Sequence, residues 1–225
     1  MEDLANEPVL QWFLAMAYEP AYVYAAVTSL LILSSFGLPV PEEVTLLSAG
    51  FIAYVGRSPE LFPAPTPDAA VVDAWLLAGI CTLAVFASDV LIYGLGRRFG
   101  PSVRNSWLSR KAIAPETWER AERWTERHGG KVCWVFRFTP GVRFPGHLTC
   151  GMVKLPFWQF CLADGVATLV SVPTQVLLIS FYGHVVIANL KLVKLGIVIV
   201  FVLTVAFFVV RKVLRRRRRR RGPAR

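Results

Sequence analysis

The fold is indicated most clearly by residues 132–153, which read VCWVFRFTPGVRFPGHLTCGMV. The stretch is apolar enough for a membrane, yet it contains two charged residues, Arg137 and Arg143, and a Pro140 and Gly141 pair between them. Proline removes a helical hydrogen-bond donor and blocks the turn before it, so one regular helix cannot span this stretch. Irregular backbone at membrane depth survives only where it is buried in protein or lines a wet cavity. We therefore predict a re-entrant helical hairpin over 132–153.

A second stretch of the same kind covers residues 37–55, which read GLPVPEEVTLLSAGFIAYV. Pro39 and Pro41 break it near its start, and two acids, Glu42 and Glu43, follow at once. The same argument predicts a re-entrant hairpin here, with Pro39 and Pro41 in one break and Pro140 and Gly141 in the other.

The two predicted hairpins indicate an internal repeat. Glu43 precedes Gly50 by seven positions, and Arg143 precedes Gly151 by eight. Each hairpin is followed by a long apolar span with a single aspartate, which is Asp89 in one case and Asp164 in the other. Hairpins that enter from opposite faces are typical of inverted-topology repeats, in which broken helices meet near the bilayer midplane.

The composition supports a polytopic membrane protein with helices only. Of the 225 residues 55% are hydrophobic and 18% are charged, whereas soluble domains carry about 25% charged residues. This argues against an ordinary soluble enzyme, a disordered regulator and a disulfide scaffold. A bilayer core needs roughly 20 apolar residues as helix, and four stretches meet or approach that length: 21–36, 74–95, 157–182 and 195–210.

The basic residues are concentrated in the tail, 211–225. The tail holds ten of the 25 lysines and arginines, so the rest of the chain is neutral although the net charge is +10. Because the tail follows an apolar segment, it favours a cytoplasmic anchor on anionic lipid, and no nucleic-acid partner is expected. Its central run consists of Arg215, Arg216, Arg217, Arg218, Arg219, Arg220 and Arg221.

Loop charges predict the orientation. Nine basic residues lie between positions 97 and 131, whereas Arg57 is the only one between 54 and 73. The positive-inside rule then puts both termini in the cytoplasm, with the first hairpin entering from outside and the second from the cytoplasm. The expected organisation has three parts: a cytoplasmic or interfacial segment over 1–20, a membrane domain over 21–210 and the tail. An amphipathic helix over 115–128 is expected at the cytoplasmic interface.

Few residues outside the hairpins indicate chemistry. The sequence has no nucleophile elbow, phosphate-binding loop or HExxH motif, so we predict no enzyme, no cofactor and no metal. The cysteines at 81, 133, 150 and 161 form no CxxC pair and are expected in the core. His147 is expected to be satisfied locally, and Asp164 to cap the cytoplasmic end of its helix.

Three motifs resemble the DedA family, also called the SNARE-associated or VTT-domain family. They cover 37–43 with Ala49 and Gly50, then 89–93 with a Gly-Arg pair and a further glycine, then 136–143 with Gly151. Four residues depart from the family pattern: Glu42 replaces a glycine or serine, Ser88 replaces a glycine, and Ser34 and Ser35 stand where many members have an acid.

The resemblance implies a lipid transporter of the bacterial inner membrane. It implies movement of a polyprenyl-phosphate carrier, such as undecaprenyl phosphate, or of a phospholipid between leaflets. The residues suit this, because the forks of Arg137 and Arg143 match phosphate bidentately. Glu42, Glu43 and Asp89 are expected to pair with these arginines or to couple transport to protons.

Other functions remain open at this point. A passive phospholipid scramblase and an ion-coupled transporter of a small solute are the main alternatives, and a membrane enzyme would need a nucleophile or metal cluster that the sequence does not show. An assembly factor with purely structural ion pairs is also consistent with the sequence. The oligomeric state is not indicated.

Overall fold

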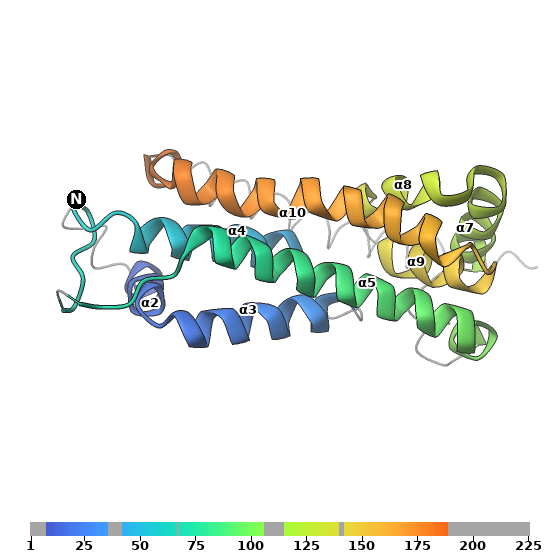
Figure 1. Ribbon diagram of the computed structural model, residues 1–225, viewed down its shortest axis with the longest axis horizontal. Helices are drawn as coiled ribbons and strands as arrows, with labels where there is room; N and C mark the ends of the chain where they lie inside the picture. Colours follow the sequence, from blue (N-terminus) through green and yellow to red (C-terminus); the bar gives the residue numbers. More distant parts are fainter. Residues whose placement is uncertain (1–7, 36–41, 67, 106–114, 140–141, 189–225) are drawn as a thin grey trace, which may run out of the picture. The chain divides into compact units, whose positions relative to one another are not determined.

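The computed structural model describes residues 8–35, 42–66, 68–105, 115–139 and 142–188, and within these ranges every regular element is a helix (Figure 1). The chain divides into two compact units, Met1–Phe181 and Tyr182–Arg225. The expected all-helical class is confirmed for the part of the chain that the structure describes. The helices are α2 (Pro8–Ala17), α3 (Pro20–Ser35), α4 (Glu42–Gly56), α5 (Ala74–Asn105), α7 (Pro115–His128), η1 (Gly129–Lys131), α8 (Val132–Phe138), α9 (Arg143–Met152) and α10 (Phe157–Ala188).

Two helices are long and apolar enough to cross a membrane. They span Ala74–Gly100 in α5, with 27 residues, and Phe157–Val185 in α10, with 29 residues. Both exceed the roughly 20 residues that a bilayer core requires. Of the other two predicted spans, 21–36 forms the shorter apolar helix α3, with 16 residues, and 195–210 lies outside the described residues.

Large apolar side chains remain exposed along these two helices. Leu83 on α5 is 70% exposed, and Leu169 on α10 is 65% exposed. Continuous apolar surface of this kind is unfavourable in water, and it suits contact with lipid tails. The exposed faces include Trp75, Leu76, Leu91, Trp158, Leu162, Val166 and Val170.

Both predicted hairpin regions are helical, with different details. Over 37–55 the described part is the single helix α4, which begins at Glu42 with two acids in its first turn, where the helix dipole favours negative charge. Over 132–153 two short helices, α8 and α9, lie on either side of residues 139–142. Pro39, Pro41, Pro140 and Gly141 lie outside the described residues. The re-entrant geometry therefore stays a prediction.

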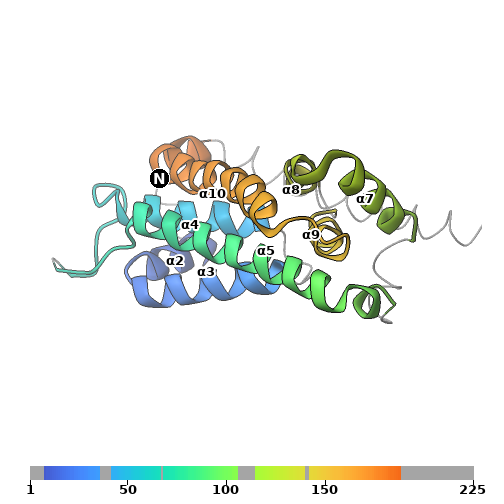
Figure 2. The same ribbon diagram turned by 45° about the vertical axis from the view of Figure 1, so that its right-hand side comes forward.

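Helix α5 organises the first unit, Met1–Phe181. It lies alongside α3 and α4 over its first half and against α9 over its second half (Figures 1 and 2). Glycines make the α5–α9 contact close: a Cβ on Gly96 would overlap the carbonyl of Leu148, and a Cβ on Gly151 would lie 2.6 Å from the Arg97 nitrogen. The two backbones thus touch, and this fixes α9 against the half of α5 that begins at Asp89.

Helix α7 matches the predicted amphipathic helix at both ends, Pro115–His128. Its apolar face, however, is covered by protein. Trp118 is buried in a cluster with Leu148 and Ile92, and the hydroxyl of Thr125 lies 3.9 Å from the Cys150 sulfur. Since α9 covers this face, a protein contact accounts for the amphipathic pattern, and the expected position at the cytoplasmic interface stays a prediction.

The cysteines lie where the sequence predicts. Cys81, Cys133 and Cys150 are buried and Cys161 is half-buried, and all four are free thiols. Cys133 and Cys150 share an apolar cluster with Phe136 and Phe160 between α8, α9 and α10. This cluster packs against the charged site described next.

Candidate functional site

Six ionisable side chains meet in the interior of the first unit, and we call them the charged cluster. Five helices contribute to it, from widely separated parts of the sequence. The Asp89 and Asp164 side chains are fully buried, as is His147, and the Arg137 side chain is 4% exposed. Burial of so many charges is unfavourable unless they are paired, so their contacts decide what the site can do. The members are Glu42 (α4), Asp89 (α5), Arg137 (α8), Arg143 and His147 (α9) and Asp164 (α10).

Asp89 lies at the centre of the charged cluster. Arg143 donates to it from two nitrogens, with Nε 3.1 Å and Nη2 2.8 Å from Oδ1, and Nη2 also 2.7 Å from Oδ2. Arg137 donates from Nη1 to Oδ2 at 3.0 Å. The Nδ1 atom of His147 lies 3.1 Å from Oδ1. One carboxylate therefore holds both guanidinium groups and the imidazole, through charge-assisted hydrogen bonds.

The arginines connect Asp89 to the other two carboxylates. Arg143 forms an ion pair with Glu42 through Nη1. Arg137 lies 3.7 Å from the Glu42 carboxylate and 3.4 Å from Asp164 Oδ1, and its Nε donates to the Ser171 hydroxyl at 3.0 Å. The Arg143 and Glu42 side chains are 17% and 13% exposed, so they form the most accessible edge of the charged cluster.

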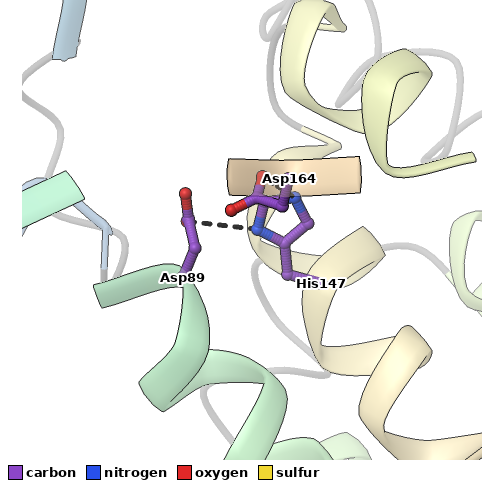
Figure 3. A group of neighbouring side chains, drawn as sticks. All are labelled: Asp89, His147 and Asp164. Carbon is purple, nitrogen blue, oxygen red and sulfur yellow. Dashed lines mark hydrogen bonds and ion pairs between the residues drawn. The ribbon is translucent and has the colours of Figure 1, made fainter. Parts of the chain in front are cut away.

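His147 and Asp164 have incomplete hydrogen bonding. Figure 3 shows these side chains converging with Asp89 from three different helices. His147 Nε2 lies 3.5 Å from Asp164 Oδ1. Within the described ranges neither Nε2 nor the Oδ2 atom of Asp164 has a hydrogen-bond partner, although both atoms are buried. Such atoms are rare in folded proteins and point to an occupant or a proton.

A metal ion does not fit the site well. Asp89, His147 and Asp164 each offer one ligand atom, and these atoms lie within 4.8 Å of one another. The oxygens of Asp89 already accept hydrogen bonds from both arginines and the imidazole. A divalent ion would displace those donors and lie beside two buried guanidinium groups, which repel it. We therefore do not treat these residues as metal ligands.

The structure brings together four of the five charged residues that the sequence singled out. Arg137, Arg143, Glu42 and Asp89 are in contact. Glu43 is exposed and has no ion pair with a described residue, so its predicted pairing is corrected in favour of Glu42.

Sequence reasoning underestimated Asp164 and His147. Asp164 was expected to cap a helix end, but it lies in the eighth position of α10, in contact with Arg137. Asp164 is the single charged residue of its apolar span, as Asp89 is of its own, and this pattern could have indicated a functional residue. His147 was expected to have a local partner, but it contacts α5 and α10. Its spacing of four from Arg143 puts both on one face of α9.

Ser35 and Ser88, which both depart from the family pattern, contact each other beside the charged cluster. The Ser88 hydroxyl lies 2.8 Å from the Ser35 hydroxyl, and both side chains are buried. This hydrogen bond joins the end of α3 to α5 next to Asp89. The two serines thus form a neutral polar contact at this position.

The model of the VTT domain matches residues 40–185 of the chain, which include the whole charged cluster. The chain belongs to the VTT-domain family. A Haemophilus influenzae protein named as an uncharacterized membrane protein is 31% identical over 158 residues, which cover 70% of this chain and 69% of the relative. The membrane protein YkoX of Bacillus subtilis is 29% identical over 58% of this chain and 52% of the relative.

The VTT-domain assignment agrees with further relatives. Protein DedA of Escherichia coli strain K12 is 27% identical over 145 residues, which cover 60% of this chain and 63% of DedA. No solved structure matches the chain. The VTT-domain protein is therefore a membrane protein of the DedA family, and the apolar faces of α5 and α10 are the surfaces that suit its bilayer.

Proposed function

We propose that this VTT-domain protein transports a lipid with an anionic phosphate headgroup between the leaflets of a bacterial inner membrane. The substrate class is a polyprenyl-phosphate carrier, such as undecaprenyl phosphate, or a related phospholipid. In this proposal the protein is a transporter and not an enzyme. The DedA relatives and the two arginines of the charged cluster support it.

The observation that carries the proposal is the pairing of Arg137 and Arg143 on one carboxylate. Arginine keeps its charge under all physiological conditions, and its planar fork matches a phosphate group with two parallel hydrogen bonds. Both guanidinium groups donate to Asp89. A phosphate that replaced this carboxylate would receive donors from two directions without any change in the arginines themselves.

Exchange of partners gives the proposal a mechanism. The headgroup enters at the accessible edge formed by Glu42 and Arg143 and takes over the donors of Arg143 and then of Arg137. The carboxylates of Glu42 and Asp89 lose their counterions, and proton uptake then relieves the negative charge. Because Glu43 lies outside the charged cluster, the mechanism assigns it no role.

The lipid chain stays in the bilayer during this exchange. Large apolar residues are exposed along α5 and α10, among them Leu83 and Leu169. They offer the acyl or isoprenoid chain a surface to slide along, so that only the headgroup enters the polar interior. The protein would cross the membrane several times with both termini in the cytoplasm. The arginines at 215–221, which lie outside the described residues, would contact anionic lipid.

Reconstitution tests the proposed function. Purified protein in liposomes with fluorescent polyprenyl phosphate is compared with Arg143→Ala and with Arg143→Lys. Arg143→Ala removes one bidentate donor and should slow headgroup transfer about tenfold or more. Arg143→Lys, which keeps the charge and loses the fork, should have an intermediate rate. Arg123→Ala on the exposed face of α7 is the matched control and should transfer lipid at the wild-type rate.

The same assay separates the alternatives. Equal transfer of zwitterionic and anionic lipids, without an effect of a pH gradient, would indicate a passive scramblase. A folded wild-type protein that moves no lipid under either condition would contradict the proposed function, and an ion-coupled solute transporter or an assembly factor would then replace it.

A further inference from the structure

We infer that His147 and Asp164 together hold one exchangeable proton, between the imidazole Nε2 and the carboxylate Oδ1, and that this proton travels with the anionic substrate. The inference deepens the proposed function and rests on it for the transport step. The proton site itself can be tested without transport. The sequence analysis assigned proton coupling to Glu42, Glu43 and Asp89, so this is a different site.

The hydrogen-bond geometry favours a proton at this position. Asp89 Oδ1 is an acceptor 3.1 Å from His147 Nδ1, so Nδ1 carries a hydrogen and donates it. A neutral imidazole then presents a lone pair at Nε2, and this atom faces the Asp164 Oδ1 acceptor at 3.5 Å. Two acceptors that face each other in a buried site repel. One proton on either atom converts the repulsion into a hydrogen bond.

The net charge of the charged cluster also indicates one bound proton. The charged cluster holds three carboxylates and two guanidinium groups, so with a neutral imidazole it carries one uncompensated negative charge. A buried unpaired charge is strongly unfavourable, and a single proton neutralises it. The ionisable groups around His147 are Asp89 from α5, Arg137 from α8, Arg143 on its own helix and Asp164 from α10.

A proton suits the position better than a metal cation. Only Nε2 of His147 and the two oxygens of Asp164 remain for a cation, and one of these oxygens already lies 3.4 Å from the Arg137 guanidinium. Ca²⁺ and Mg²⁺ need six or more oxygen ligands, and zinc needs four ligands. A proton needs only the two facing atoms that the structure supplies.

The proton and the substrate should bind together. When a phosphate takes the guanidinium groups away from Asp89, the charged cluster gains negative charge beside His147 and Asp164. That charge favours the protonated pair, and by reciprocity the proton favours the anion. Both side chains are fully buried, so proton exchange requires the same opening that admits the headgroup. The coupling therefore has the sign of a symport.

Nitrogen NMR of His147 tests the proton site directly. The chain has three histidines, and the other two, His128 and His184, are exposed, so a variant with glutamine at both leaves one imidazole signal. In full-length protein in lipid nanodiscs the ¹⁵N shifts of His147 should show a single one-proton step between about pH 5 and pH 9, which belongs to the His147–Asp164 pair and not to the imidazole alone. The step should be absent in Asp164→Asn, whose amide donates to Nε2 permanently. It should persist in the control Glu60→Gln, a carboxylate in the exposed loop.

Binding of an anion tests the coupling. Inorganic sulfate is the probe, because its charge is constant over this pH range. Wild-type protein should bind sulfate about tenfold more tightly at pH 6 than at pH 8, and Asp164→Asn should bind it equally at both values. If Asp164→Asn does not fold, the NMR step of the wild type tests the proton site, and the sulfate affinities of the wild type at pH 6 and pH 8 test the coupling.

Several outcomes would overturn the inference. They are the absence of any one-proton step at His147 across the pH range, a His147 signal that moves when zinc or sodium is added at constant pH, and sulfate affinity without pH dependence. If lipid transfer fails in liposomes but the NMR step is present, the proton site stands and the proposed transport does not. If lipid transfer is equally pH-dependent in wild type and Asp164→Asn, transport stands and the inference fails.

Discussion

At the scale of single residues, the adjacent acids Glu42 and Glu43 have different surroundings. Consecutive residues on a helix point about 100° apart, so α4 directs Glu42 and Glu43 to different surroundings. Glu42 pairs with Arg143 and lies near Arg137, whereas Glu43 is exposed. The carboxylate of Glu42 therefore forms ion pairs with the two arginines, whereas that of Glu43 lies on the surface of the protein.

Neutralising each acid in turn makes this difference measurable. Glu42→Gln should destabilise the protein by about 1.5 to 3 kcal/mol, because Arg143 loses a charged acceptor, and it should slow lipid transfer. Glu43→Gln should change the stability by less than about 0.5 kcal/mol and leave transfer unchanged. Thermal unfolding in detergent and the liposome assay measure both effects. Equal losses in the two variants would contradict the assignment of Glu42 to the charged cluster.

At the scale of helices, the contact between α5 and α9 positions the charged cluster. Asp89 lies on α5, and Arg143 and His147 lie on α9, so the hydrogen bonds between them require the two backbones to stay close. Gly96 and Gly151 allow that approach, because a side chain at either would overlap backbone atoms of the other helix. The site thus depends on glycines that allow the close approach of the two helices.

An alanine at Gly96 should separate the two helices. A Cβ there would overlap the Leu148 carbonyl, and overpacking of this kind costs about 1 to 3 kcal/mol. Gly96→Ala should therefore lower the stability and the transfer rate together. Gly94→Ala, two residues earlier on the same helix, is the control, because a Cβ there meets nothing within 4 Å. It should be neutral or slightly stabilising, since alanine favours helix, and a loss as large as that of Gly96→Ala would refute the argument.

At the scale of the whole molecule, the distribution of charge predicts the membrane orientation. Nine basic residues lie between positions 97 and 131, and the tail holds ten more. The α5–α9 contact brings the end of α5 and the helix α9 together, and α7, with its exposed Arg123, packs on α9. Basic segments from separate parts of the chain should therefore share one side of the membrane.

Cysteine labelling checks this orientation. In a background with the four native cysteines replaced by alanine or serine, a new cysteine at Arg123 or Arg225 should react only with reagents that enter the cytoplasm. A cysteine at Asp68, in the loop between α4 and α5, should react with a membrane-impermeant maleimide from outside. Labelling of Arg123→Cys from outside would show that the predicted orientation is wrong.

The helical class and much of the site follow from local properties of the sequence. The apolar stretches of α5 and α10 and the period of α7 depend on neighbouring residues only, so their existence and the bounds of α7 could be predicted. A charged residue in an apolar segment is unfavourable wherever the segment packs, which is why Arg137, Arg143 and Asp89 could be singled out.

The tertiary structure alone decided which charges meet. The choice of Glu42 over Glu43 depends on the rotation of α4, and the inclusion of His147 and Asp164 depends on how α9 and α10 pack beside α5. The burial of the α7 face depends on α9 in the same way. Spacing in the sequence does not determine the distances in space between segments that lie tens of residues apart, because the packing of whole helices sets those distances. The predicted acids and arginines became one charged cluster only through that packing.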